Sequence, residues 1–151
     1  MITPAPTNKI DPRLCRGIFE RTIAAKGHGI GDSNGAEHVV ISIPDTSYEL
    51  HLVPTAPVTS KPGNRIIGTV RVSARRIDEV KSGGRYLEPV FGRPRRVQGT
   101  VIAIEPDAVV VNAGVPVWVK PTDARQSAAN FAVGQFVSFD ALDGGTFTPQ
   151  V

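Results

Sequence analysis

The residues best placed to do chemistry are the basic ones in the middle third of the chain. The segment from Arg65 to Arg96 holds nine Lys or Arg residues against three acidic ones. The residues before it hold six of each kind, and those after it hold two basic and five acidic ones. Phosphate groups bind where several cations share one face, because affinity comes largely from the release of counterions. The sequence therefore predicts a phosphate-binding face formed by Arg71, Arg75, Arg93, Arg95 and Arg96.

Aromatic residues lie among or near these cations. Tyr86 and Phe91 lie inside the basic segment. Trp118 lies after it, two positions before Lys120. Aromatic rings stack on unpaired bases, and each such contact contributes about 1–3 kcal/mol. We therefore predict that Tyr86 and Trp118 stack bases beside the arginines. Two other interpretations stay open: an Arg-rich strand can protect an exposed sheet edge, and the N-terminal segment of the same domain can cover Trp118.

The other reactive side chains form no pattern that points to catalysis. Cys15, the only cysteine, has no evident general base and is expected to be a buried structural thiol. His38 and His51 lack a carboxylate at a spacing suited to a metal, so we expect them at the surface or rim. The glycine-rich run at 27–35 lacks the spacing of a phosphate loop. We predict no catalytic residue, metal ligand or cofactor and expect a protein that is not an enzyme, although residues distant in sequence can also build an active site.

Length and composition match one globular domain. At 151 residues, with 40% hydrophobic and 21% charged residues, the chain is long enough to bury its own core. Its 15 glycines and 13 prolines favour short elements joined by turns. A single cysteine excludes an internal disulfide and Cys-based zinc sites, which favours a reducing compartment. Because no signal-like segment or long apolar run is present, we expect a cytoplasmic protein without a membrane span.

For the N-terminal part, the sequence predicts a tail over residues 1–10 and then a helix. Asp11 followed by Pro12 suits a helix start. Side chains then recur at helical spacing before Gly27, at Leu14, Ile18, Thr22 and Ala25. Gly17 and the β-branched residues of this segment leave a strand open. One domain is expected over residues 11–145, followed by a second tail over residues 146–151.

The rest of the chain shows β patterns. Two hairpins are predicted, over 38–43 with 48–53 and over 97–104 with 108–111, and further strands over 65–75, 115–120 and 135–140. In the strand at 65–75, Val70 and Val72 alternate with Arg71 and Ser73, so one face is apolar and the other basic. A short helical turn is expected within 121–130. Residues 65–83 also resemble residues 96–114, which leaves an internal duplication open.

A longer pattern begins at Gly99. The run GTVIAIEPDAVVVNAGVPVWV, followed by VGQFVSF at 133–139, resembles the strand pattern of OB-fold RNA-binding barrels of the ribosomal and translation-factor type. The resemblance covers about residues 97–140, and its matching positions are Gly99, Val101, Asp107, Val109, Val111, Gly114, Val133, Gly134 and Val137. It implies a small, partly closed antiparallel barrel that binds RNA. The family often has aromatic residues in the first hairpin and on the third strand; here only Trp118 matches the second of these.

These features predict a mainly β domain: a partly closed antiparallel barrel of the OB type with about five to seven strands and one N-terminal helix. The expected function is non-catalytic binding of RNA or single-stranded DNA through the basic face. The alternative is a protein-interaction or self-assembly domain without a nucleic-acid role. In that case the positive middle of one subunit meets the negative C-terminal part of another, which gives a homo-oligomer.

Overall fold

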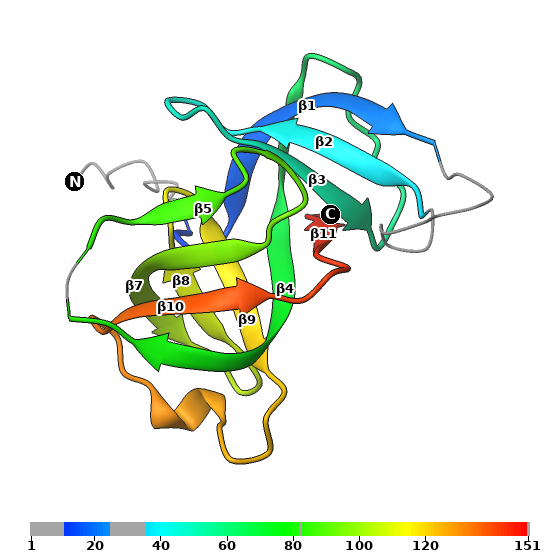
Figure 1. The fold of residues 1–151 in the computed structure, drawn as a ribbon. Coiled ribbons are helices and arrows are strands. Elements are labelled where there is room, and N and C mark those ends of the chain that lie inside the picture. Colours follow the sequence, from blue (N-terminus) through cyan, green and yellow to red (C-terminus); the bar gives the residue numbers. More distant parts are fainter. Residues whose placement is uncertain (1–10, 25–35, 82, 151) are drawn as a thin grey trace, which may run out of the picture.

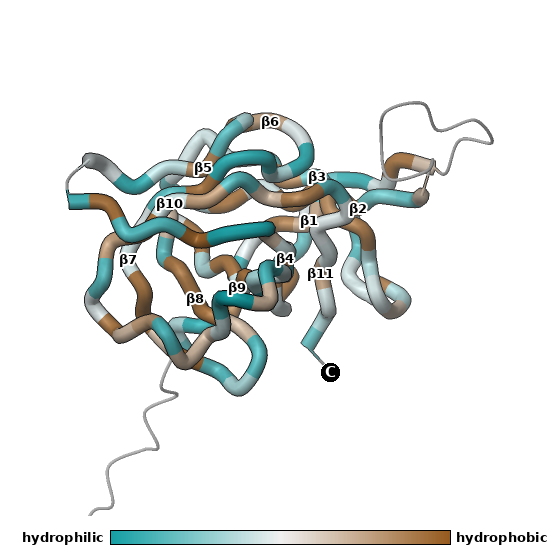
Figure 2. Tube along the Cα trace, turned by 60° about the horizontal axis from the view of Figure 1, so that its bottom comes forward, coloured by the Kyte–Doolittle hydropathy of each residue, from teal (hydrophilic) through white to brown (hydrophobic). Residues whose placement is uncertain are grey.

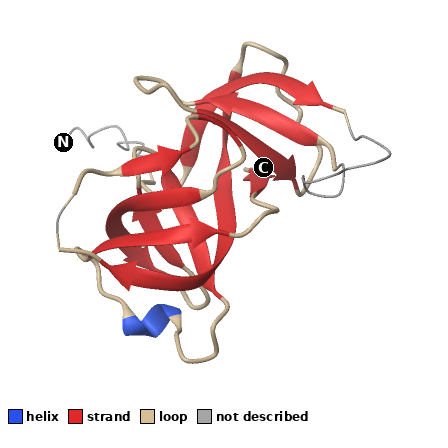
Figure 3. Ribbon diagram, viewed as in Figure 1, coloured by secondary structure: helices blue, strands red, loops and turns tan. Residues whose placement is uncertain are grey.

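The computed structural model describes residues 11–24, 36–81 and 83–150. In these ranges the chain forms one sheet of eleven strands and a short 3₁₀ helix, Ala128–Asn130 (Figure 3). None of the described residues belongs to a helix long and apolar enough to cross a membrane. The strands are β1 (Cys15–Ile23), β2 (His38–Ser42), β3 (Glu49–Pro54), β4 (Arg65–Glu79), β5 (Tyr86–Glu88), β6 (Phe91–Gly92), β7 (Arg96–Ile104), β8 (Val109–Asn112), β9 (Pro116–Pro121), β10 (Phe136–Ala141) and β11 (Thr146–Pro149).

Strand pairing can be followed around two circuits that share β4. In the first, the antiparallel strands β1, β2 and β3 lead to β11, which is parallel to β3, and then to β4, which pairs back with β1. In the second, the antiparallel strands β7, β8 and β9 lead to β4, which is parallel to β9, and then to β10, which pairs with β7. The two circuits therefore have the same order of antiparallel and parallel pairings. Figure 1 shows them as two groups of strands with β4 passing through both.

The length and alternation of β4 allow it to serve both circuits. Its 15 residues place Val70, Val72 and Ala74 in the core, while Arg71 and Arg75 are exposed. This confirms the predicted apolar and basic faces of the strand. Since one face of β4 is apolar over most of its length, both circuits can pack against it.

Buried apolar side chains from both circuits form one core. Leu50, Leu52 and Phe147 come from the first circuit, and Val101 and Val117 from the second, and all five are fully buried. In Figure 2, hydrophobic residues, drawn in brown, recur along β7 and β8 of the second circuit. Most residues of this core lie on strands, and the connections add Ile43, Ala113, Val115 and Ala128.

The segment predicted as a helix is the strand β1, so that prediction was wrong. Residues four positions apart share one face of a strand as well as one face of a helix, so the observed spacing did not distinguish the two. Ile18, Thr22 and Ile23 are β-branched and favour the extended chain. A Cβ atom at Gly17 would overlap the side chain of Ile41 in β2, so glycine permits the close approach of the two strands.

The predicted C-terminal tail is also wrong over residues 146–149, which form β11. This strand pairs with both β3 and β4, and the side chain of Phe147 is fully buried. A Cβ atom at Gly68 of β4 would overlap the Phe147 ring, so this glycine leaves room for it. The strand was missed because it has only four residues, ends in Pro149 and follows two glycines. The predicted tail at 1–10 and the whole glycine-rich run at 27–35 lie outside the described residues.

The expectation of about five to seven antiparallel strands was wrong, because the described sheet has eleven strands and the pairs β3–β11, β3–β6 and β4–β9 are parallel. The remaining strand predictions are confirmed to within a few residues. The first predicted hairpin is β2 with β3, the second is β7 with β8, and the predicted strand at 65–75 is β4, which continues to Glu79. The 3₁₀ helix lies where a helical turn was expected. Residues 65–79 form one continuous strand, whereas residues 96–112 form a hairpin, so the internal sequence similarity does not correspond to a repeated local structure.

Tyr48 joins the two circuits through its hydroxyl group. The hydroxyl donates to the carbonyl of Ala113, at 2.9 Å, and accepts from the N–H of Leu87, at 3.0 Å. Replacing Tyr48 with Phe leaves both backbone groups without this partner, so we expect the free energy of unfolding to fall by about 1–2 kcal/mol in denaturant titrations. Tyr86→Phe is the matched control, because the Tyr86 hydroxyl contacts only the side chain of exposed Arg96. An equal loss in both variants would contradict the assigned role of Tyr48.

Candidate nucleic-acid interface

The predicted arginines meet around the chain segment 140–144, at the end of β10. The N–H of Ala141 donates to the carbonyl of Arg95, at 2.8 Å, and the N–H of Leu142 donates to the carbonyl of Ser73, at 2.7 Å. The segment therefore lies between β4 and the residues that lead into β7. Because both neighbours carry arginines, residues far apart in the sequence are brought next to this one segment; Figure 1 shows β10 between β4 and β7.

Three hollows border this segment, and we name each by one residue. The Trp118 hollow has a volume of about 220 Å³ and is lined by Arg71, Ser73, Asp107, Trp118, Lys120 and Asp143, among others. The Ser138 hollow, of about 410 Å³, is lined by Arg75, Arg76, Asp78, Arg96, Ser138, Asp140 and Leu142, among others. The Arg95 hollow, of about 240 Å³, is lined by Arg93, Pro94, Arg95, Ala141 and Asp143.

Together the three hollows form what we call the basic surface. All five predicted arginines line it, and the structure adds Arg76 and Lys120. These seven cations face four aspartates, Asp78, Asp107, Asp140 and Asp143, so the lining has a surplus of three positive charges. Arg76 was not among the arginines predicted to bind phosphate. It is exposed beside Arg75 because the pairing of β4 with β10 is irregular at this point.

Trp118 of β9 supports Arg71 of β4. The two residues are partners in the parallel pairing, and the guanidinium carbon of Arg71 lies 4.2 Å from the centre of the indole ring. The indole N–H donates to the carbonyl of Arg13, at 3.0 Å. Arg13 is itself held by ion pairs with Asp11, at 2.9 Å, and Glu105, at 2.6 Å. The half-buried ring is thus in contact with both the N-terminal segment and a guanidinium, which makes Arg71 the more accessible partner for a ligand.

Two of the five arginines are paired with carboxylates. Arg96 contacts Asp140 at 2.7 Å and the Tyr86 hydroxyl at 3.0 Å, and both contacts raise the pKa of the guanidinium. Arg93 contacts Asp143 at 2.7 Å. Such pairs at the surface are weak, with a typical contribution of about 0–1 kcal/mol, so an incoming polyanion can compete with them. Among the described residues, Arg71, Arg75 and Arg95 form no ion pair.

The predicted aromatic residues occupy different surroundings. Tyr86 is half-buried on β5 and holds Arg96 through its hydroxyl group, so the structure brings it to the edge of the basic surface. Phe91 is 52% exposed but lies on β6, which pairs with β3 of the first circuit. Its ring contacts the ring of His51 edge-on, with centres 4.8 Å apart. Phe91 lines none of the three hollows.

The cysteine and histidines do not form a catalytic arrangement. Cys15 is fully buried, as predicted, and burial raises the pKa of its thiol to about 12. His38 is only 6% exposed, so its predicted surface or rim position was wrong; its Nδ1 lies 2.7 Å from the carbonyl oxygen of Ala36. Burial and the nearby charge of Arg21 lower the pKa of His51. Over the part of the chain that the structure describes, no three His, Cys, Asp or Glu side chains are grouped to hold a metal ion.

No protein-family model, curated protein or solved structure matches this chain. The basic surface is therefore interpreted from its own charges and contacts. Those contacts leave Arg71, Arg75 and Arg95 without a carboxylate partner among the described residues and hold Arg76, Arg93 and Arg96 in weak surface pairs. This arrangement can bind anions, and the spread of its cations over three adjoining hollows suits an anion with several charges.

Proposed function

We propose that the protein is a non-catalytic module that binds RNA or single-stranded DNA through the basic surface. The observation that carries the proposal is that Arg71, Arg75, Arg93, Arg95 and Arg96 all line hollows bordering the same segment, 140–144. Seven cations in three hollows that border one short segment can contact successive phosphates of one strand. Binding of this kind depends mainly on charge, so we expect little sequence selectivity.

The contacts of the basic surface support single strands over duplexes. An Arg guanidinium stacks on unpaired bases as aromatic rings do, and Arg71 is presented by the ring of Trp118. A base in a duplex is already stacked and does not expose its face to such a side chain. In this proposal Trp118 positions Arg71 and Tyr86 positions Arg96. Unpaired bases stack on these guanidiniums and next to the two aromatic rings.

The proposal includes an OB-like barrel formed by the second circuit. An OB-fold closes a three-stranded meander with two further strands, one of them parallel to the third strand, and β7, β8, β9, β4 and β10 have this order of pairing. OB-folds bind oligonucleotides on the face of the second and third strands, next to the loop between the first two strands. Here Trp118 and Lys120 of β9 line the same hollow as Asp107 and Ala108 of the β7–β8 connection.

Oligonucleotide binding at two salt concentrations tests the proposal. We expect single-stranded RNA and DNA of about 16 nucleotides to bind at about 50 mM salt, and much more weakly at about 200 mM. The double variant Arg71→Gln/Arg95→Gln removes two cations that form no ion pair with another described residue. It should lower the slope of log affinity against log salt by about 1.4, because each lost contact with a single strand removes about 0.7.

The matched control is Arg16→Gln/Arg65→Gln, which makes the same change in net charge. Both residues are exposed and line none of the three hollows. We expect the salt slope of the control to differ from that of the unmodified protein by less than half of the value of about 0.7 that one phosphate contact contributes. Equal slopes for the two double variants, or no binding of the unmodified protein at low salt, would overturn the proposal.

A second candidate function is protein association, and exposed apolar side chains favour it. Val90 and Phe91 are adjacent and 50% and 52% exposed. The head-to-tail contact between opposite charges has less support, since Asp140 and Asp143 form ion pairs within the chain. Sedimentation at high protein concentration distinguishes the candidates: an oligomer that Phe91→Ser dissociates supports association, and a monomer throughout excludes it.

A further inference from the structure

The Ser138 hollow differs from the other two because donors approach it from both sides and from below. Arg75 and Arg76 come from β4 and Arg96 from β7, and β10, which carries Ser138, lies between these strands. Ser138 alternates with the core residues Val137 and Phe139, so its side chain is on the face of the sheet where the hollow lies. The guanidiniums therefore flank the hollow, and Ser138 lies at its floor.

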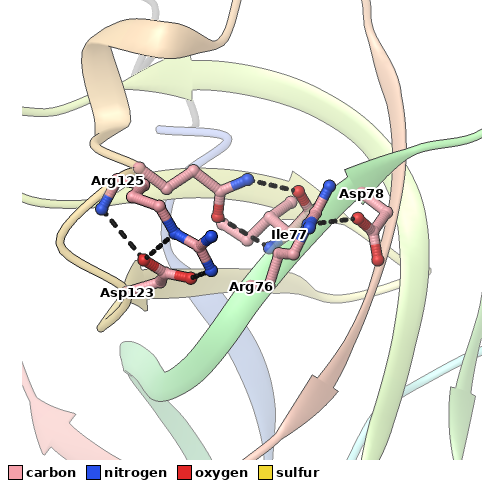
Figure 4. A network of polar contacts seen from close by, with 6 residues as sticks. Arg76, Ile77, Asp78, Asp123 and Arg125 are labelled. Atoms are coloured by element: carbon pink, nitrogen blue, oxygen red, sulfur yellow. Dashed lines mark hydrogen bonds and ion pairs between the residues drawn. The ribbon is translucent and has the colours of Figure 1, made fainter.

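Each of these four side chains keeps hydrogen-bond donors for a ligand. The side chain of Arg75 has no hydrogen bond or ion pair with a described residue. Arg76 contacts Asp78 through Nε alone, at 2.9 Å, as Figure 4 shows. Arg96 uses Nε and Nη1 for Tyr86 and Asp140. The Ser138 side chain is buried, with 4% of the residue exposed, and its hydroxyl has no hydrogen-bond partner among the described residues.

A buried hydroxyl without a partner needs an explanation, because it costs about 1–3 kcal/mol. We propose that the Ser138 hollow binds a phosphomonoester or free phosphate dianion, held by the guanidiniums of Arg75, Arg76 and Arg96 and by the Ser138 hydroxyl. A terminal phosphate has three free oxygens and a charge of about −1.5 to −2 near neutral pH. A phosphodiester inside a strand has two free oxygens and one charge. Donors on both sides and at the floor match the terminal group.

Asp140 regulates the affinity of this site in the proposal. Its carboxylate pairs with Arg96 at 2.7 Å and lines the same hollow, where it takes the place of an anion when no ligand is bound. A phosphate must compete with this carboxylate for the guanidinium. Removing the charge of Asp140 therefore frees Arg96 and lowers the repulsion of the ligand.

Titration calorimetry with inorganic phosphate tests the site directly. Arg75→Gln should weaken phosphate binding about tenfold, since it removes a charged donor. Arg65→Gln, on the same strand but outside the hollow, should leave it unchanged. Ser138→Ala should weaken binding about fivefold while the protein stays as stable as before or becomes more stable, because the unpaired hydroxyl is removed. A merely structural role of Ser138 predicts the opposite change in stability.

A variant that tightens phosphate binding serves as a control, because misfolding would weaken binding and not strengthen it. Asp140→Asn should tighten phosphate binding about fivefold. Asp143→Asn makes the same change of charge beside Arg93, outside the Ser138 hollow, and should have a smaller effect. If the unmodified protein and Asp140→Asn both fail to bind phosphate, or if the two Asn variants behave alike, the proposed site is wrong.

The inference does not depend on the proposed nucleic-acid function, and oligonucleotides separate the two. A 5′-phosphorylated strand that binds more tightly than the same strand with a 5′-hydroxyl, in a manner lost in Ser138→Ala, supports both and identifies a strand end as the ligand. Equal binding of the two strands, without phosphate binding, overturns the phosphate site and leaves the proposed function standing. Phosphate binding without oligonucleotide binding overturns the proposed function and supports a site for small phosphorylated molecules.

Discussion

Replacing Phe147 with Ala is expected to lower the free energy of unfolding by about 3–5 kcal/mol. Phe147 is fully buried in the core. It also belongs to β11, the strand that connects β3 to β4 and completes the first circuit. The loss consists of the burial free energy of the removed ring and the cost of the cavity that it leaves next to Gly68. Chemical denaturation followed by tryptophan fluorescence and by circular dichroism measures this change.

Phe91→Ala is the matched control for this experiment. The same ring is removed from a side chain that is 52% exposed, so we expect a loss of no more than about 1 kcal/mol. If Phe147→Ala were as mild as the control, β11 would not be part of the core, and the earlier interpretation of residues 146–151 as a tail would be restored.

Local patterns were sufficient to predict most strands. The hairpin of β2 and β3 has Val, Ile and Leu on both sides of the turn residues 44–47, and β7 with β8 has the same composition around 105–107. In β4 the alternation of apolar and basic residues gave both the strand and the outward direction of Arg71. These predictions succeeded because burial of one face imposes a period of two on the sequence.

Elements that depend on distant partners were not predictable from local patterns. The segment at 15–23 becomes a strand because β2 and β4 lie on either side of it, with Gly17 allowing the close contact. The short strands β5, β6 and β11 have between two and four residues and exist through pairing with β7, β3 and β4. Strands as short as these do not bury enough surface to be recognised in the sequence alone.

The candidate site was predicted in its charges but not in its pairings. The sequence has an excess of cations over 65–96, and in the structure the five predicted arginines line hollows that border the segment 140–144. This excess did not show that Arg93 and Arg96 are paired with Asp143 and Asp140 from the acidic C-terminal part. The role of Ser138 also depends on strands from both sides, so no signal in its own neighbourhood pointed to it.

The shared strand gives the basic surface its shape. β4 is parallel to β9 in one part and antiparallel to β10 in another, so its outward arginines meet Trp118 at one point and β10 at the next. The second circuit must therefore stay closed for the three hollows to remain next to one another. Within this circuit β7 pairs with β8, and Gly99 of β7 lies close to the backbone at the end of β8.

Gly99→Ala tests this close contact between β7 and β8 and is expected to destabilise the protein by about 3 kcal/mol. A Cβ atom at Gly99 would overlap the backbone carbonyl of Asn112 at the end of β8. The backbone of Asn112 cannot rotate away from the new methyl group as a flexible side chain could, so β7 and β8 must move apart. Because the connection between them carries Asp107 and Ala108 of the Trp118 hollow, oligonucleotide binding should weaken together with stability.

Gly84→Ala separates this steric effect from the general effect of replacing glycine. A Cβ atom at Gly84 meets no atom within 4 Å, and its backbone angle is not in the left-handed region. Restricting the unfolded chain at such a position stabilises a protein by about 0.4–1 kcal/mol. The two Gly→Ala variants should therefore change the unfolding midpoint in opposite directions. A Gly99→Ala protein that unfolds and binds like the unmodified one would mean that β8 does not pass over Gly99, and the circuit that forms the basic surface would have to be redrawn.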